Sequence, residues 1–186
     1  MNKKMPNKIY TRGSQLDCET EKGAYFIDKQ YSTTNILKNK YPSLIFKHRK
    51  LKTAGEDCYV YHNNKLSAVS EIKCRPYINR DKKIPFTFEI LKNKYKNEYL
   101  ITAEKLYHLQ SISKARGIPS FVFFDLPSEK CIVRLKITDN NGEFVTTFEE
   151  RETMTKYSCN DEKGDTVRLN AFIPIDTPTA EVIKYS

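Results

Sequence analysis

One short run of residues restricts the fold of this chain more than any other. Residues 120 to 124, SFVFF, place aromatic or apolar side chains on both faces of a strand. A strand buried on both faces lies in the centre of a sheet, and it usually pairs in parallel with a neighbour through a helical crossover. The run therefore predicts an α/β fold with its central strand at this position.

The residues before this run supply the expected crossover helix. Thr102 can cap a helix, and Gly117 followed by Pro119 ends it. The apolar face of that helix includes Leu106, Leu109 and Ile112.

Four earlier elements complete the predicted core. Residues 20 to 40 repeat apolar or aromatic side chains at helical spacing, and Tyr41-Pro42 provides the stop. A strand is expected at about 43 to 51. Residues 57 to 61 and 66 to 75 are rich in Tyr, Val, Ile and Cys and read as a hairpin with its turn at 62 to 65. The predicted order is α-β-β-β-α-β, a mixed sheet flanked by helices.

The second face of this hairpin carries charge. Side chains alternate across a strand, so Cys58 and the apolar residues of the second strand share one face, while Asp57, Glu71 and Lys73 share the other. Two nearby carboxylates repel unless a cation lies between them, and Mg²⁺ accepts carboxylate oxygens. The lysine can then orient or deprotonate an attacking water, or stabilise charge on a phosphate, which is the chemistry of phosphodiester hydrolysis. The alternative is a solvated strand face on which Glu71 and Lys73 form a surface ion pair.

The charge of the chain favours a polyanionic partner. The formal net charge is +9, and the basic residues gather between residues 38 and 96, on both sides of the acidic pair. Acidic residues concentrate in 139 to 165 instead. This distribution favours contact with nucleic acid. The alternative is a lysine-rich surface in a chain that is also rich in Asn, Ile and Tyr.

The length of the chain and its motifs exclude several other classes of protein. A chain of 186 residues with 39% hydrophobic content predicts a single domain, 1 to 186. No apolar run reaches the roughly 20 residues that span a bilayer, and the start lacks a secretory signal, so we expect a cytoplasmic protein without a membrane partner. The five widely spaced cysteines indicate neither a disulfide framework nor a zinc site, and Cys58 and Cys74 read as core residues. Hydrolase elbows and phosphate-binding glycine loops are missing from the sequence.

The charged hairpin and the elements that follow it resemble a known family. Asp57, followed after thirteen residues by Glu71-Ile72-Lys73, then a helix, Gly-Ile-Pro and an apolar strand, resembles the PD-(D/E)xK or restriction-endonuclease-like nuclease superfamily. The match spans about residues 17 to 126 and looks closest to small resolvase-like or phage-type nucleases. Glu56 stands where the signature name has Pro, which lowers the specificity of the match.

The resemblance implies roles for particular residues. Asp57 and Glu71 would bind Mg²⁺, with Mn²⁺ as an alternative, the Ile72 carbonyl would add an oxygen, and Lys73 would assist the attacking water. The superfamily often adds an acid from its first helix. Glu21 is the candidate, because it lies at helical spacing with Ala24, Asp28 and Tyr31 on a face expected to turn toward the sheet; Asp28 and Glu19 are the next candidates. An equally good account of Glu21 is an acid favoured by the helix dipole. The residues expected to contact DNA are Arg49, Lys50, Arg75, Arg80, Lys82, Lys83 and Lys105. For Lys105 the alternative is a solvated lysine on the helix surface.

Two further segments carry predictions. Residues 75 to 98 form a long connection directly after Lys73, and we expect a basic flap that contacts substrate. The alternative is a surface excursion with a short helix at 89 to 96. Beyond the core, 130 to 137 and 142 to 148 are predicted as strands joined by the Asn-Gly turn at 139 to 142, and 166 to 175 as one more strand. This β-rich extension, 127 to 186, is expected to extend the sheet or form an appendage, with a role in homodimerisation or substrate clamping.

Three functions follow from these observations. The leading one is a Mg²⁺-dependent deoxyribonuclease, expected to be an endonuclease. The second is a non-catalytic nucleic-acid-binding or complex-forming protein on the same fold. The third is a protein-interaction factor that neither binds nor cleaves nucleic acid. Whether DNA or RNA is preferred, and which DNA structure, stays open at this level.

Overall fold

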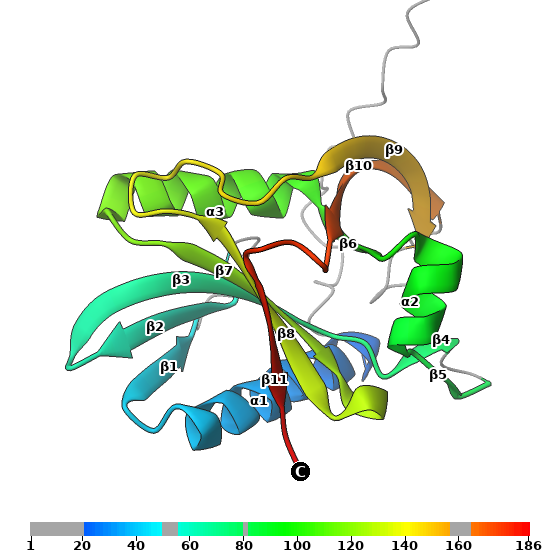
Figure 1. Ribbon diagram of the computed structural model, residues 1–186, viewed down its shortest axis with the longest axis horizontal. Helices are drawn as coiled ribbons and strands as arrows, with labels where there is room; N and C mark the ends of the chain where they lie inside the picture. The colour runs from blue at the N-terminus through cyan, green and yellow to red at the C-terminus, as the bar shows by residue number, and fades with distance from the viewer. Residues whose placement is uncertain (1–20, 50–55, 80–81, 157–164) are drawn as a thin grey trace, which may run out of the picture.

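A six-stranded mixed sheet with one helix on each face forms the centre of the molecule (Figure 1). The computed structural model of the chain describes residues 21–49, 56–79, 82–156 and 165–186. The strands follow the order β1-β2-β3-β7-β8-β11. They span β1 Leu44–His48, β2 Cys58–His62, β3 Lys65–Cys74, β7 Ser120–Leu126, β8 Cys131–Thr138 and β11 Ala180–Lys184.

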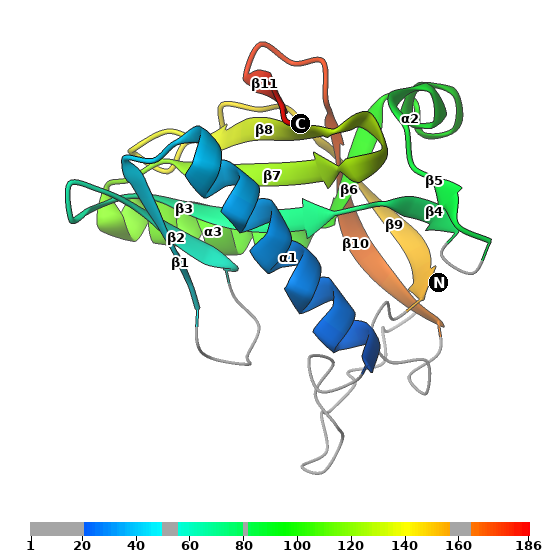
Figure 2. The same cartoon turned by 90° about the horizontal axis from the view of Figure 1, so that it is seen from below.

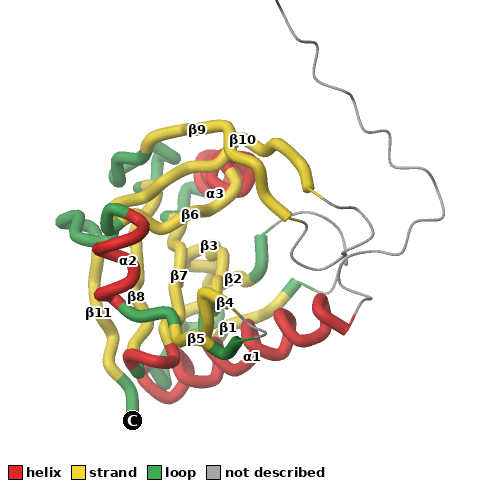
Figure 3. Tube along the Cα trace, turned by 90° about the vertical axis from the view of Figure 1, so that its right-hand side faces the viewer, coloured by secondary structure: helices red, strands yellow, loops and turns green. Residues whose placement is uncertain are grey.

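Two helices enclose this sheet. Helix α1, Glu21–Lys40, runs diagonally across one face, and α3, Ala103–Arg116, covers the other (Figures 2 and 3). On the α1 side, Leu37 packs with Ile72 and Phe123. On the α3 side, Leu106 and Leu109 pack in a second core cluster of buried side chains. The prediction of a mixed α/β sheet flanked by helices is confirmed.

The central strand behaves as its composition predicts. Six of the seven residues of β7 are buried, and the strand pairs in parallel with β3 from Val69↔Ser120 to Cys74↔Asp125. Helix α3 is the last part of the crossover between these two strands, and Gly117 ends it with φ +65°. Thr102 holds the N-cap position as expected, but its side chain makes no capping hydrogen bond.

The predicted hairpin is also present. Strands β2 and β3 pair antiparallel from Cys58↔Ser70 to His62↔Lys65. Asn63 and Asn64 form the turn with φ values of 49° and 60°, the left-handed conformation that two-residue hairpin turns require. Cys58 and Cys74 lie in the core as expected, and both are free thiols.

The connection between β3 and α3 is partly structured. A small hairpin, β4 Tyr77–Asn79 and β5 Ile84–Pro85, leads into α2, Phe88–Tyr95, and then into β6, Glu98–Thr102. Thr87 caps α2 by accepting the Ile90 N–H at 3.2 Å. The short helix of the alternative interpretation is therefore present, while β6 was not predicted.

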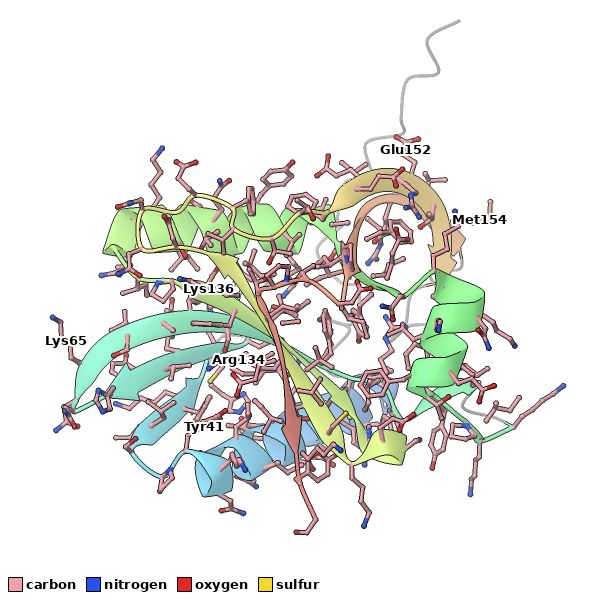
Figure 4. The ribbon with its side chains drawn as sticks, in the orientation of Figure 1. Tyr41, Lys65, Arg134, Lys136, Glu152 and Met154 are labelled. Carbon is pink, nitrogen blue, oxygen red and sulfur yellow. The ribbon has the colours of Figure 1, made fainter. Side chains whose placement is uncertain are left out.

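The C-terminal third contributes to two sheets. Strands β8 and β11 extend the main sheet, whereas β9, Glu149–Lys156, and β10, Asp165–Pro174, join β6 in a curved sheet of order β6-β10-β9. Glu152 and Met154 lie on the outside of β9 (Figure 4). Both parts of the prediction, sheet extension and appendage, apply to different strands.

One predicted strand was wrong. Residues 142 to 148 form only an isolated bridge, Thr138↔Phe144, although the turn before them forms with Gly142 N–H donating to the Asp139 carbonyl at 3.2 Å. The reason is that β7 and β11 occupy the two edges of β8 over most of its length. Phe144 and Phe148 instead pack against the core on the α3 side.

Within the described residues, no helix is long and apolar enough to cross a membrane.

Candidate active site

The charged residues of the hairpin meet where β2 begins. Asp57 stands one residue before β2, and its N–H donates to the Ser70 carbonyl at 3.2 Å. Its Oδ2 accepts the Ile72 N–H at 2.8 Å, which ties the carboxylate to β3. The structure thus brings Asp57, Glu71 and Lys73 into one cluster.

Glu71 is the centre of this cluster. Its side chain is fully buried, and its two oxygens accept from different lysines. Oε1 lies 2.6 Å from Lys73 Nζ, and Oε2 lies 3.1 Å from Lys105 Nζ. Lys105 Nζ is also 4.0 Å from Asp57 Oδ1. Two carboxylates and two ammonium groups therefore share one site.

Lys105 joins the cluster because α3 packs over β3. It lies in the first turn of α3, where the sequence analysis assigned it to DNA contact only. Its ammonium group lies near both acids, whereas Lys73 pairs with the other oxygen of Glu71. Sequence spacing alone does not show this contact, because the two segments are 34 residues apart.

This environment shifts the pKa values of the two carboxylates in opposite directions. Burial and the nearby Glu71 raise the pKa of Asp57 from 3.8 to about 6. Burial acts on Glu71 in the same sense, but Lys73 and Lys105 outweigh it and lower the pKa of Glu71. Burial opposes the charge of Lys73, yet Glu71 and Asp57 raise its pKa above the ordinary value. At neutral pH Lys73 is therefore an ammonium donor.

A residue from α1 reaches the same place. Gln30 Nε2 donates to the Ile72 carbonyl at 3.4 Å, the carbonyl that the family resemblance assigns to the metal. Sequence reasoning missed Gln30. The available signal was its helical spacing with Thr33 and Leu37, both of which are fully buried against the sheet.

The helical face expected to carry an acid toward the sheet was assigned wrongly. Ala24 and Asp28 are exposed, and Tyr31 is about half exposed. The buried stripe of α1 lies more than a third of a turn away, through Thr33, Thr34 and Leu37. Glu21 begins α1, but its side chain and the whole of Glu19 lie outside the described residues.

The basic residues predicted to contact DNA lie in several places. Arg75 is exposed just after β3, where its Nε donates to the Tyr99 hydroxyl at 3.2 Å. Lys82 and Lys83 are exposed before β5, and Arg49 pairs with Glu56 after β1. Lys50 and Arg80 lie outside the described residues.

The donor set at this site fits a hard divalent cation. Two carboxylates and the Ile72 carbonyl present oxygen atoms, the ligands that Mg²⁺ prefers. Burial first, and then the negative charge of Glu71, raise the pKa of Asp57, and a cation between the two acids would offset both effects. In the part of the chain that the structure describes, no group of three or more His, Cys, Asp or Glu side chains could hold a metal.

Comparison with known proteins identifies no relative, since no family model, curated protein or solved structure matches the chain. Function is therefore inferred from the fold and the charged cluster.

Proposed function

We propose that this chain is a divalent-metal-dependent nuclease that hydrolyses DNA phosphodiester bonds on a restriction-endonuclease-like core. The observation that carries the proposal is the cluster of Asp57, Glu71 and Lys73 on the β2–β3 hairpin, with Lys105 added from α3. A fully buried carboxylate with a lysine within hydrogen-bond distance of each oxygen, beside a second acid, is rare on an ordinary solvated strand face, because burying charge is costly.

The order of elements supports the fold assignment. Leaving out the insertion from β4 to β6, the elements follow α1, β1, β2, β3, α3 and β7. This is the α-β-β-β-α-β order that the resemblance implies, and the parallel pairing of β3 with β7 fits it. The acids stand at the start of β2 and within β3, the strand that begins the crossover.

Each residue of the cluster then has a role. Asp57, Glu71 and the Ile72 carbonyl would hold Mg²⁺ or Mn²⁺, which when bound supplies positive charge that stabilises the charge of the reacting phosphate. Lys73, kept protonated by Glu71, would orient the attacking water and offset negative charge on the phosphate. Lys105 would hold Glu71 in place and contribute a second positive charge.

A cleavage panel tests this proposal. Duplex, branched and single-stranded DNA are incubated with the protein in Mg²⁺ and in EDTA. We expect cleavage in Mg²⁺ alone, and a loss of about a hundredfold or more in Asp57→Ala and Lys73→Ala. Lys65→Ala is the matched control, because Lys65 lies on the same strand but is exposed at the far end of the hairpin (Figure 4). Unchanged cleavage by the two site variants, with their folding intact, would remove the site.

A specific observation favours a second candidate. The four charges of the cluster already balance, since each carboxylate oxygen of Glu71 has an ammonium partner without any metal. A non-catalytic nucleic-acid-binding or complex-forming protein would use such a cluster as a structural ion-pair network. That protein would bind DNA with strong salt dependence and would cleave none of the three substrates in any divalent metal.

A further inference from the structure

A second polar network lies beside the proposed catalytic cluster and has no role in the mechanism above. Its centre is Glu56, whose side chain is 3% exposed. Oε2 of Glu56 accepts from Arg49 Nη1 at 3.2 Å and lies 2.8 Å from His108 Nε2. Burial opposes the charge of Glu56, but hydrogen bonds from Tyr59 and His108 with the charge of Arg49 lower its pKa. Glu56 is therefore a carboxylate at neutral pH.

The network adjoins the catalytic cluster in two ways. Glu56 and Asp57 are consecutive in the chain, and His108 follows Lys105 by three residues on α3. Residues three apart on a helix are neighbours on one face, about 5–6 Å between their Cβ atoms. Two consecutive acids thus meet two neighbouring basic residues of α3, Asp57 near Lys105 and Glu56 near His108.

The basic members of this network reach the surface although the acid does not. The side chain of His108 is 39% exposed and that of Arg49 is 24% exposed. A buried carboxylate that holds a guanidinium and an imidazole fixes their orientation before any ligand arrives, which lowers the entropic cost of binding. The guanidinium has the planar geometry that suits phosphate oxygens, and a protonated imidazole is a donor through both nitrogens.

We propose that Arg49 and His108, held in place by Glu56, form a phosphate subsite for the phosphodiester group adjacent to the one that is cleaved. The inference rests on the proposed function, because it assigns this subsite to the same DNA strand that enters the catalytic cluster. Glu56 is a positioning residue in this arrangement, and Arg49 and His108 contact the substrate. The subsite sets the register of the strand across Asp57, Glu71 and Lys73.

Substrates with one neutral linkage test the subsite directly. After the cleavage position is mapped, duplexes carrying a single methylphosphonate at each linkage around it are bound in Ca²⁺, with cleavage followed separately in Mg²⁺. At one adjoining linkage, the neutral group should weaken binding by wild type about three- to tenfold. The same modification should have a smaller effect on Arg49→Gln or His108→Gln than on wild type, because each variant has already lost one of the two contacts. Additive effects of modification and substitution at every linkage would overturn the proposal.

Salt dependence provides a second readout. Removing one phosphate contact at Arg49 should reduce the slope of log affinity against log salt by about 0.9. Lys184→Gln is the matched control, because it removes one positive charge from β11, the sheet edge three strands away from β3. His108→Gln keeps an N–H donor for Glu56, and thermal melting checks the folding of each variant. If Arg49→Gln does not fold, Arg49→Lys keeps the charge and loses the guanidinium, so affinity should fall while the slope stays.

The outcomes separate the two proposals. Normal cleavage and binding by wild type, together with unchanged affinity and salt slope in both variants, would overturn the subsite and leave the nuclease in place. Salt-dependent binding without cleavage would remove the nuclease, and with it the subsite as defined here. A wild-type protein that neither binds nor cleaves DNA would overturn both.

Discussion

At the scale of single residues, the two acids of the cluster differ because only Glu71 has close ammonium partners on both oxygens. Lys73 and Lys105 lie 2.6 and 3.1 Å from it, whereas Asp57 has Lys105 at 4.0 Å and one backbone N–H. Ionised Asp57 is consequently the less stable member of the pair in the absence of metal. This difference has a measurable effect on stability.

Asp57→Asn should stabilise the metal-free protein at pH 8. The pKa of Asp57 is raised from 3.8 to about 6, so the folded state binds more protons than the unfolded state between these values. Ionised Asp57 therefore costs stability above pH 6, and the cost disappears below about pH 4. We expect the free energy of unfolding to rise by about 1–3 kcal/mol at pH 8 and to be unchanged near pH 4, measured by urea unfolding in EDTA.

Magnesium should make wild type more stable than Asp57→Asn at pH 8, the reverse of the order without metal. A cation bound between the acids stabilises wild type and has little to bind in Asp57→Asn, so Mg²⁺ should raise the melting temperature of wild type alone. Equal stability of the two proteins at pH 8 in EDTA, or equal responses to Mg²⁺, would contradict the assignment of Asp57.

At the scale of elements, the turn after β8 is held against α3 through Gly142. This glycine has φ +79°, and its carbonyl accepts from Gln110 Nε2 at 3.0 Å. An added Cβ would lie 2.7 Å from Lys114 Cβ and 3.0 Å from the backbone of Lys114. The contact keeps the residues after β8 on the α3 side of the sheet.

Gly142→Ala should therefore destabilise the protein by about 2–4 kcal/mol, from left-handed strain and the clash with α3. Gly117→Ala is the matched comparison, because Gly117 has φ +65° but open space around its missing Cβ. We expect that variant to lose only about 1–2 kcal/mol, the strain alone. Chemical denaturation of both variants measures the difference, and equal losses would mean that the packing against Lys114 does not matter.

The hairpin of β4 and β5 also has a prediction of its own. Lys82 and Lys83 are exposed there, close in sequence to Arg80 and to the exit of β3. Charge reversal at Arg80, Lys82 and Lys83 should weaken DNA binding and flatten its salt dependence while Mg²⁺ still raises the melting temperature.

The matched control for this change is charge reversal at Lys38, Lys40 and Lys65. These exposed lysines lie at the end of α1 and at the β2–β3 turn, on the opposite side of the molecule from β4 and β5 (Figures 1 and 2). Fluorescence anisotropy over a salt series compares the two triple variants. Similar losses in both would indicate a general charge effect and exclude a flap.

At the scale of the whole molecule, Asp125 connects segments from both ends of the described chain. It is 2% exposed at the end of β7. Its Oδ2 accepts from Thr33 Oγ1 of α1 at 2.7 Å, and its Oδ1 accepts from the Tyr185 hydroxyl after β11 at 2.7 Å. Helix α1, the central strand and the C-terminal segment are thereby joined.

Tyr185→Phe should lower the free energy of unfolding by about 1–3 kcal/mol, because it removes a hydrogen bond to a buried carboxylate. Tyr41→Phe serves as the control, since its hydroxyl donates to exposed Glu181 at 3.4 Å and should contribute less than about 0.5 kcal/mol. Thermal and urea unfolding of both variants compare the two hydrogen bonds. A Tyr185→Phe protein as stable as wild type would show that Asp125 does not hold the C-terminal segment.

The elements that could be predicted from the sequence are those specified by neighbouring residues. The two-sided apolar run at 120–124, the Asn63-Asn64 turn and the stop at Gly117 each depend on local patterns, and all three are present. Strand β6 was missed because its partner β10 lies about 70 residues later, so its ladder has no local signal. The false strand at 142–148 has the same origin, because β11 occupies the edge of β8 that a hairpin partner would need.

The residues of the candidate site show the same difference between local patterns and contacts with distant segments. Hairpin register and the alternation of side chains are enough to place Asp57, Glu71 and Lys73 together, since Glu71 and Lys73 lie on β3 and Asp57 directly precedes its partner strand β2. Lys105, Gln30 and His108 enter only when α1 and α3 pack on opposite faces of the sheet. Alternation along a strand is a property of a few consecutive residues, whereas the contact of a helix with a strand depends on how the whole chain closes on itself. The sequence by itself therefore determined the acids and their lysine, and only the tertiary structure decided which side chains surround them.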